Sequence, residues 1–105
     1  MSFFVYRLIP PRPSFSTDLT DEEQLIMMRH GEYWKQHSAD RTALVFGPVA
    51  DPKGVWGLGV IETEDAEAAT KLADADPAIT TGLCTYEVLP MLSAVLRSDV
   101  SATMG

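Results

Sequence analysis

Runs rich in Val, Leu, Ile and aromatic residues alternate along the chain with two longer segments of helical periodicity. Strand patterns cover residues 3–9, both halves of a hairpin within residues 41–62, and residues 83–89. Helical patterns lie between them, over residues 20–37 and 63–76. The resulting order is β-α-β-β-α-β, which is the ferredoxin-like arrangement. The sequence therefore predicts an α+β fold with an antiparallel sheet.

Local signals set the ends of the first strand and the first helix. Three prolines within residues 10–13 end the strand, because proline cannot donate to a sheet, and residues 14–18 are expected to form a loop. Thr20 and Glu23 have the spacing of a capping box and predict the start of the helix. Leu25, Met27 and Met28 are expected to give this helix its apolar contacts.

Similar signals bound the hairpin and the second helix. The sequence Asp51-Pro52-Lys53-Gly54 is typical of the turn between two strands. Thr63 is the expected N-cap of the second helix. Pro77 disfavours helical geometry in the residue before it, so the helix should stop there, and residues 77–81 should form a short turn.

Alternation along the strands assigns side chains to the two faces of the sheet. The face expected under the helices carries Phe4, Tyr6, Leu8, Trp56, Leu58, Val60, Cys84, Tyr86 and Val88. The other carries Phe3, Val5, Arg7, Ile9, Val55, Gly57, Gly59, Ile61, Leu83, Thr85, Glu87 and Leu89. Arg7 and Glu87 are expected to pair there, and Gly57 and Gly59 would leave space for a ligand or for a partner's side chain.

That second face is too apolar to lie in water. We therefore predict a homodimer whose sheets pack face to face, an arrangement known as a dimeric α+β barrel. The alternative is that the C-terminal tail covers the face. A single domain is expected over residues 1–90, followed by a tail over residues 91–105.

Charge and cysteine content narrow the partners and the compartment. A net charge of −7 disfavours nucleic acids and anionic membrane surfaces as partners. The chain shows no signal-peptide pattern and no apolar run long enough to span a bilayer. A single cysteine, Cys84, excludes an internal disulfide, so the prediction is a cytoplasmic protein. On a buried strand face that thiol should be unreactive.

His30 and Asp76 are the candidate catalytic residues. An imidazole titrates near neutral pH and can move protons, and a carboxylate can orient it and stabilise its charged form. Each also has a structural interpretation: His30 as a packed residue at the edge of a helix, and Asp76 as the N-cap before Pro77. Asp51 and Asp74 are competing carboxylates, interpreted as a turn residue and a solvated helix end. His37, near the helix end, is interpreted as structural.

Phe46, Gly47 and Pro48 form the candidate substrate-binding wall at the end of a strand, where a glycine would allow a ligand to approach closely. Simple termination of the strand explains the same residues. The chain has no glycine-rich phosphate loop and no Cys/His spacing for zinc. No cofactor and no metal are therefore predicted.

In their order and spacing, these features resemble the YciI-related family of the dimeric α+β barrel superfamily. They are His30, Val45-Phe46-Gly47-Pro48-Val49, Gly57 with Gly59, residues 64–69, Asp76-Pro77 and Gly82-Leu83. The resemblance implies a ferredoxin-like fold, dimerisation, and a His–Asp site that falls on His30 and Asp76. Some relatives resemble enzymes that act on substituted aromatic rings, including by dehydrochlorination. Residues 10–18 and the tail depart from the shortest members.

Two functions are open at this point. One is a cofactor-independent enzyme of lyase or isomerase type, in which His30 and Asp76 act as an acid/base pair on a small organic, in some relatives aromatic, substrate. The other is a non-catalytic dimer that binds a small molecule in the same pocket. The sequence names neither the substrate nor the reaction.

Overall fold

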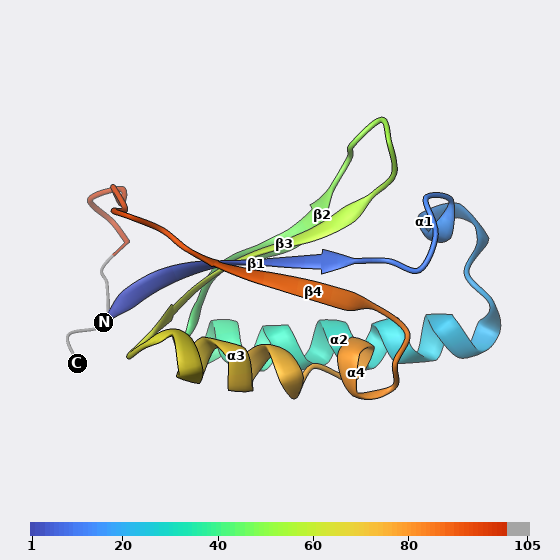
Figure 1. Ribbon diagram of the computed structural model, residues 1–105, viewed down its shortest axis with the longest axis horizontal. Helices are drawn as coiled ribbons and strands as arrows, with labels where there is room; N and C mark the ends of the chain where they lie inside the picture. The colour runs from blue at the N-terminus through green and yellow to red at the C-terminus, as the bar shows by residue number, and fades with distance from the viewer. Residues whose placement is uncertain (101–105) are drawn as a thin grey trace.

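A four-stranded antiparallel sheet with helices packed on one side forms the structure, a computed structural model that describes residues 1–100 (Figure 1). The elements are β1 (Ser2–Ile9), α1 (Phe15–Asp18), α2 (Asp21–Ala39), β2 (Ala43–Val49), β3 (Trp56–Thr63), α3 (Ala66–Asp74), α4 (Pro77–Thr80) and β4 (Thr85–Pro90). The strand order is β2-β3-β1-β4, with every neighbouring pair antiparallel. This confirms the predicted α+β, ferredoxin-like fold.

Helix α2 begins with the predicted capping box. The Thr20 hydroxyl accepts from the Glu23 backbone at 3.2 Å, and the Thr20 backbone donates to the Glu23 carboxylate at 2.9 Å. The buried residues of α2 are His30 and Trp34. Leu25 and Met28 are 57% and 60% exposed, so the prediction that they pack against the core is wrong. The aromatic and histidine positions, rather than these aliphatic ones, define the face that meets the sheet.

Residues 15–18, predicted as loop, form the short helix α1 beyond the end of β1 (Figure 1). Phe15 is its buried residue, and the Arg12 guanidinium fixes the segment by bonding to both Asp18 and Glu23. A helix this short has no periodicity that a sequence pattern can reveal. Residues 77–80, predicted as a turn, likewise form the short helix α4.

The face assignment of β3 is wrong by one residue. Leu8 lies opposite Gly57, and Tyr6 opposite Gly59, so these two glycines belong to the face under the helices. A Cβ atom on Gly57 would lie 3.0 Å from Leu8 Cβ, which explains the absence of a side chain there. Trp56, Leu58 and Val60 therefore belong to the outer face.

Helix α3 begins two residues later than predicted. Asp65, and not Thr63, is its N-cap and accepts from the Ala68 backbone at 2.8 Å. Thr63 still pairs with Ser2 in the sheet, so it cannot also start the helix. Ala69 and Ala73 are fully buried, and these small side chains let α3 pack closely on the sheet.

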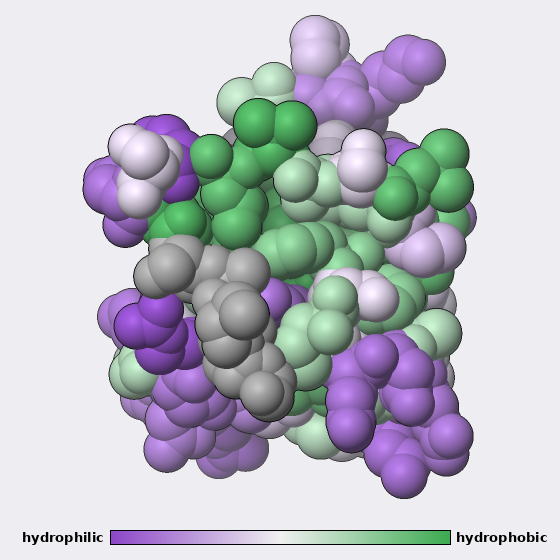
Figure 2. Space-filling view, turned by 90° about the vertical axis from the view of Figure 1, so that its left-hand side faces the viewer, coloured by the Kyte–Doolittle hydropathy of each residue, from purple (hydrophilic) through white to green (hydrophobic). Residues whose placement is uncertain are grey.

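The outer face of the sheet is apolar, as predicted. Val45 and Leu89 are each 52% exposed, and Leu58 and Val60 are half-buried. Arg7 and Glu87 form the predicted pair, with 3.8 Å between their charged atoms. Figure 2 shows hydrophobic residues gathered on the sheet side of one end of the molecule, while hydrophilic residues predominate on the helical side. The sheet therefore carries an apolar outer face on the side away from the helices.

The predicted tail is described only in part, because residues 101–105 lie outside the described residues. Within residues 91–100, Leu92 and Val95 are fully exposed. No helix within residues 1–100 is both long and apolar enough to cross a membrane.

Candidate functional site

His30 and Asp76, 46 positions apart in the sequence, meet in the interior. His30 Nδ1 lies 2.9 and 2.8 Å from the two Asp76 carboxylate oxygens. His30 comes from the buried face of α2, and Asp76 is the N-cap of α4, whose side chain accepts from the Ala78 backbone. The predicted N-cap is confirmed, and the carboxylate that caps α4 is also the hydrogen-bond partner of the imidazole.

Two further donors complete the shell around Asp76. The Tyr6 hydroxyl and the Trp34 indole each donate to Oδ2 at 2.8 Å, while the Ala78 backbone donates to Oδ1 at 2.8 Å. Burial alone opposes ionisation of Asp76, but the hydrogen bonds from His30, Trp34 and Ala78 outweigh it and lower the pKa of Asp76. A fully buried carboxylate is therefore held as an anion.

The ionised carboxylate fixes the tautomer of the imidazole. An anionic carboxylate can only accept, so His30 Nδ1 must carry the proton that it shares with Asp76. In the neutral ring the lone pair then lies on Nε2. Nε2 has no hydrogen-bond partner within residues 1–100. Every fully buried side-chain nitrogen or oxygen in that range does have a partner, so Nε2 is not fully buried. Since His30 lines the adjoining pocket, Nε2 is accessible from there.

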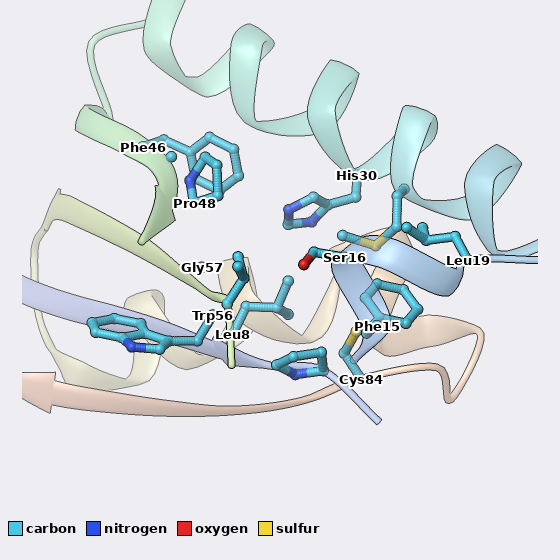
Figure 3. Close-up of a pocket in the computed structure, with 14 residues that line it drawn as sticks. Leu8, Phe15, Ser16, Leu19, His30, Phe46, Pro48, Trp56, Gly57 and Cys84 are labelled. Carbon is cyan, nitrogen blue, oxygen red and sulfur yellow. The ribbon is translucent and has the colours of Figure 1, made fainter. Parts of the chain in front are cut away.

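A pocket of about 280 Å³ opens beside His30 (Figure 3). The candidate substrate-binding residues Phe46, Gly47 and Pro48 line it, and Gly57 lies on its floor. Hydrophobic side chains supply most of the remaining lining, which includes Leu8, Pro10, Phe15, Leu19, Met27, Val55 and Trp56. The volume lies at the small end of ligand pockets, and an apolar wall with few polar groups is their usual character.

Phe46 links this wall to the buried pair. Its ring stacks on Trp34 with 5.6 Å between centroids, and it tilts against His30 with 5.1 Å between centroids. Phe46 lies opposite Gly59, so it points to the helical face. It therefore limits the movement of the imidazole and forms pocket surface at the same time.

The competing candidates lie elsewhere. Asp51 accepts from the Lys53 backbone and from the Trp56 indole, as a turn residue does. The Tyr86 hydroxyl donates to Asp74 at 2.5 Å, and His37 pairs with Asp40 at 3.0 Å. None of these groups contacts His30.

Cys84 also lines the pocket, but burial, and then the charge of Asp76, raises the pKa of its thiol to about 11. The protonated thiol is a poor nucleophile. Within residues 1–100, no group of three or more His, Cys, Asp and Glu side chains is arranged to hold a metal ion.

Sequence reasoning missed two parts of the site. Tyr6 was expected only as a packing residue and Trp34 was given no role, although the polar ends of buried tyrosine and tryptophan usually need a partner. The wall formed by Phe15, Ser16 and Leu19 was also missed, because the segment was expected to be a loop. The run of prolines before it was the one signal of a fixed conformation.

Comparison with known proteins agrees with this architecture. A solved structure of 5-chloro-2-hydroxyhydroquinone dehydrochlorinase (TftG) from Burkholderia phenoliruptrix AC1100, in complex with 2,5-dihydroxybenzoquinone, superposes with a TM-score of 0.58. The identity is 20%, over 84% of this chain and 90% of that one, so the likeness concerns the fold. No curated protein matches the chain. The model of the YCII-related domain matches residues 3–92, and the chain therefore belongs to the YCII-related (YciI-like) family.

Proposed function

We propose that this protein is an acid/base enzyme in which His30 Nε2 exchanges a proton with a small, uncharged, ring-sized organic molecule. The observation that carries the proposal is that the His30 imidazole lines the pocket while its Nδ1 is held by the buried Asp76 carboxylate. That arrangement orients a base and stabilises the cation it becomes.

The proton can be followed through the reaction. Neutral His30 accepts a proton at Nε2 from a C–H or O–H group of the substrate, and the resulting imidazolium is stabilised by Asp76. Returning the proton to a different atom of the substrate gives an isomerisation. If the electron pair left on the substrate instead forms a double bond as a leaving group departs, the reaction is an elimination. Neither route consumes an oxidant or a reductant.

The lining of the pocket favours aromatic or similarly apolar substrates. Among its side chains only His30 can carry a positive charge, and no lysine or arginine is present to hold a carboxylate or phosphate. Phe46 and Pro48 offer flat apolar surfaces. The structurally similar dehydrochlorinase is named for an aromatic substrate, and this likeness of fold supports testing aromatic compounds first.

We further propose that the protein is a homodimer joined through the outer face of the sheet. Half-buried Leu58 and Val60 and exposed Val45 and Leu89 lie on that face. Burying such a surface against its own copy would remove it from water.

A ligand screen followed by turnover assays tests the enzymatic proposal. Substituted phenols, hydroquinones and quinones would be screened by thermal shift, and each ligand found would be followed by NMR for conversion. His30→Asn keeps a donor toward Asp76 but removes the pocket-facing nitrogen. We expect it to lower kcat about 10²- to 10⁴-fold while leaving binding nearly unchanged.

The protein provides a matched control. His37→Asn changes the other histidine of α2, which pairs with exposed Asp40, and should leave kcat unchanged. Full turnover by the His30→Asn variant would contradict the proposed role. Ligands that bind but are never converted by the wild type would favour the alternative function, a non-catalytic binding protein.

A further inference from the structure

Helix α1 presents one hydroxyl to the pocket. Three hydroxyl groups lie close together in this segment, on Ser14, Ser16 and Thr17. The Ser14 hydroxyl donates to Asp18 at 2.6 Å, and the Thr17 hydroxyl donates to the Ser14 carbonyl at 2.8 Å. Ser16 lies between them, and its hydroxyl has no hydrogen-bond partner within residues 1–100. Ser16 lines the pocket, and Figure 3 shows its oxygen directed into the cavity on the side of His30. Its free hydrogen-bonding capacity therefore faces the space where a ligand would lie.

The rest of the lining makes this hydroxyl distinctive. Trp56 has a polar group, but its indole nitrogen already donates to Asp51 at 3.1 Å. Cys84 offers only a weakly polar thiol. The other lining side chains are apolar, so His30 and Ser16 are the strong hydrogen-bonding side chains available to a ligand. In a pocket of this kind, a few polar groups fix the orientation of the ligand.

The segment that carries Ser16 is held firmly. Both guanidinium Nη atoms of Arg12 donate to the Glu23 carboxylate, at 2.9 and 2.8 Å. Arg12 Nε and Nη2 also bond to the Asp18 side chain and carbonyl, at 2.8 and 3.0 Å. Phe15, next to Ser16, is 5% exposed and packs beneath Arg12. The backbone that carries the exposed Ser16 side chain is thus held in place before a ligand arrives, which lowers the entropic cost of using its hydroxyl.

We propose that Ser16 is a specificity-determining residue that hydrogen-bonds to a second polar substituent of the ligand while the first meets His30. This inference rests on the proposed function and narrows its substrate class. The preferred ligands are rings with two oxygen substituents, and rings with one are bound less tightly. Ser16 takes no proton in the reaction and acts by positioning the ring.

The test compares phenol with the three dihydroxybenzene isomers, catechol, resorcinol and hydroquinone. Dissociation constants are measured by NMR titration in oxygen-free buffer, for the wild type, Ser16→Ala and Ser14→Ala. For the wild type, we expect at least one isomer to bind about three- to tenfold more tightly than phenol, the effect of one neutral hydrogen bond. Ser16→Ala should abolish this preference and leave the affinity for phenol within twofold.

Ser14→Ala is the matched control, because it removes a neighbouring hydroxyl that donates to Asp18 and does not line the pocket. It should leave the preference intact. The inference is overturned if the preference survives Ser16→Ala, if Ser14→Ala abolishes it equally, or if the wild type shows none. A wild type that binds neither phenol nor any isomer would contradict the aromatic pocket of the proposed function, and this inference with it.

Discussion

Replacing Asp76 by asparagine removes the charge on which the buried site depends. The carboxylate is fully buried and accepts from His30, Tyr6, Trp34 and the Ala78 backbone. The asparagine side-chain oxygen can take the place of Asp76 Oδ2 and still accept from the donors that bond to Oδ2. Its NH₂ group must then face the Ala78 N–H, so two donors oppose each other without an acceptor.

The expected loss of stability follows from these contacts. An unsatisfied buried donor costs about 1–3 kcal/mol, and the remaining hydrogen bonds lose their charge assistance. The total of about 3–5 kcal/mol is typical of breaking a buried charged pair. A domain of this length is stable by about 5–15 kcal/mol, so the variant should be folded but much weaker. Tyr6→Phe, which removes one of the four donors, should cost about 1.5–2 kcal/mol.

Urea unfolding followed by tryptophan fluorescence measures the loss, because Trp34 is fully buried. The pKa of Asp76 is lower in the folded protein than in the unfolded chain. At acid pH the unfolded chain therefore binds more protons at this residue, and the stabilisation by Asp76 disappears as the pH falls below about 4. The difference in free energy between wild type and Asp76→Asn should shrink over the same range. A difference below 1 kcal/mol at pH 7, or one that does not change down to pH 3, would refute the reasoning.

Three further predictions concern other parts of the structure. Cys84, with a thiol pKa of about 11, should resist iodoacetamide at pH 8 in the folded protein and react quickly in urea, as mass spectrometry would show; fast reaction without urea would contradict the burial. Gly57→Ala should cost about 1–3 kcal/mol, because its methyl group meets Leu8 at 3.0 Å, whereas Gly47→Ala, which meets nothing within 4 Å, should stay within about 0.5 kcal/mol. Equal unfolding midpoints for the two variants would show that packing against Leu8 is not the constraint. Leu58→Asp on the outer face should convert the proposed dimer to monomer in light scattering, and an unchanged mass would count against that interface.

Local signals in the sequence were enough to predict the order of the four strands and the two longer helices, and the start of α2. Thr20 and Glu23 act within one turn of helix, so their meaning does not depend on the rest of the fold. The face of β3 could not be predicted in this way. Apolar residues occupy both the odd-numbered and the even-numbered positions of that strand, and the two glycines have no side chain that would indicate which face they belong to. The face to which the glycines belong is decided by Leu8 and Tyr6 on the neighbouring strand, because these two side chains fill the space above the glycines.

The candidate site was predictable in its residue types but not in its connections. His30 and Asp76 could be named from their chemistry and from a family resemblance, yet their contact depends on how α2 and α4 pack. Tyr6 and Trp34 join them through hydrogen bonds that no local pattern encodes. The α1 wall was unpredictable for a related reason, because it is fixed by Arg12 reaching across to Glu23 on another helix.

The carboxylate of Asp76 also has a consequence for the time course of folding. Its side-chain partners Tyr6, His30 and Trp34 lie 70, 46 and 42 positions away along the chain. Contacts across such separations require large loops to close, and the entropy of closure delays them. The anion can find all its donors only when β1, α2 and α4 have docked together. Hence a partly folded chain that has formed only its local helices and the β2–β3 hairpin has no acid/base pair, and the chemistry of the pocket begins only when the whole sheet is in place.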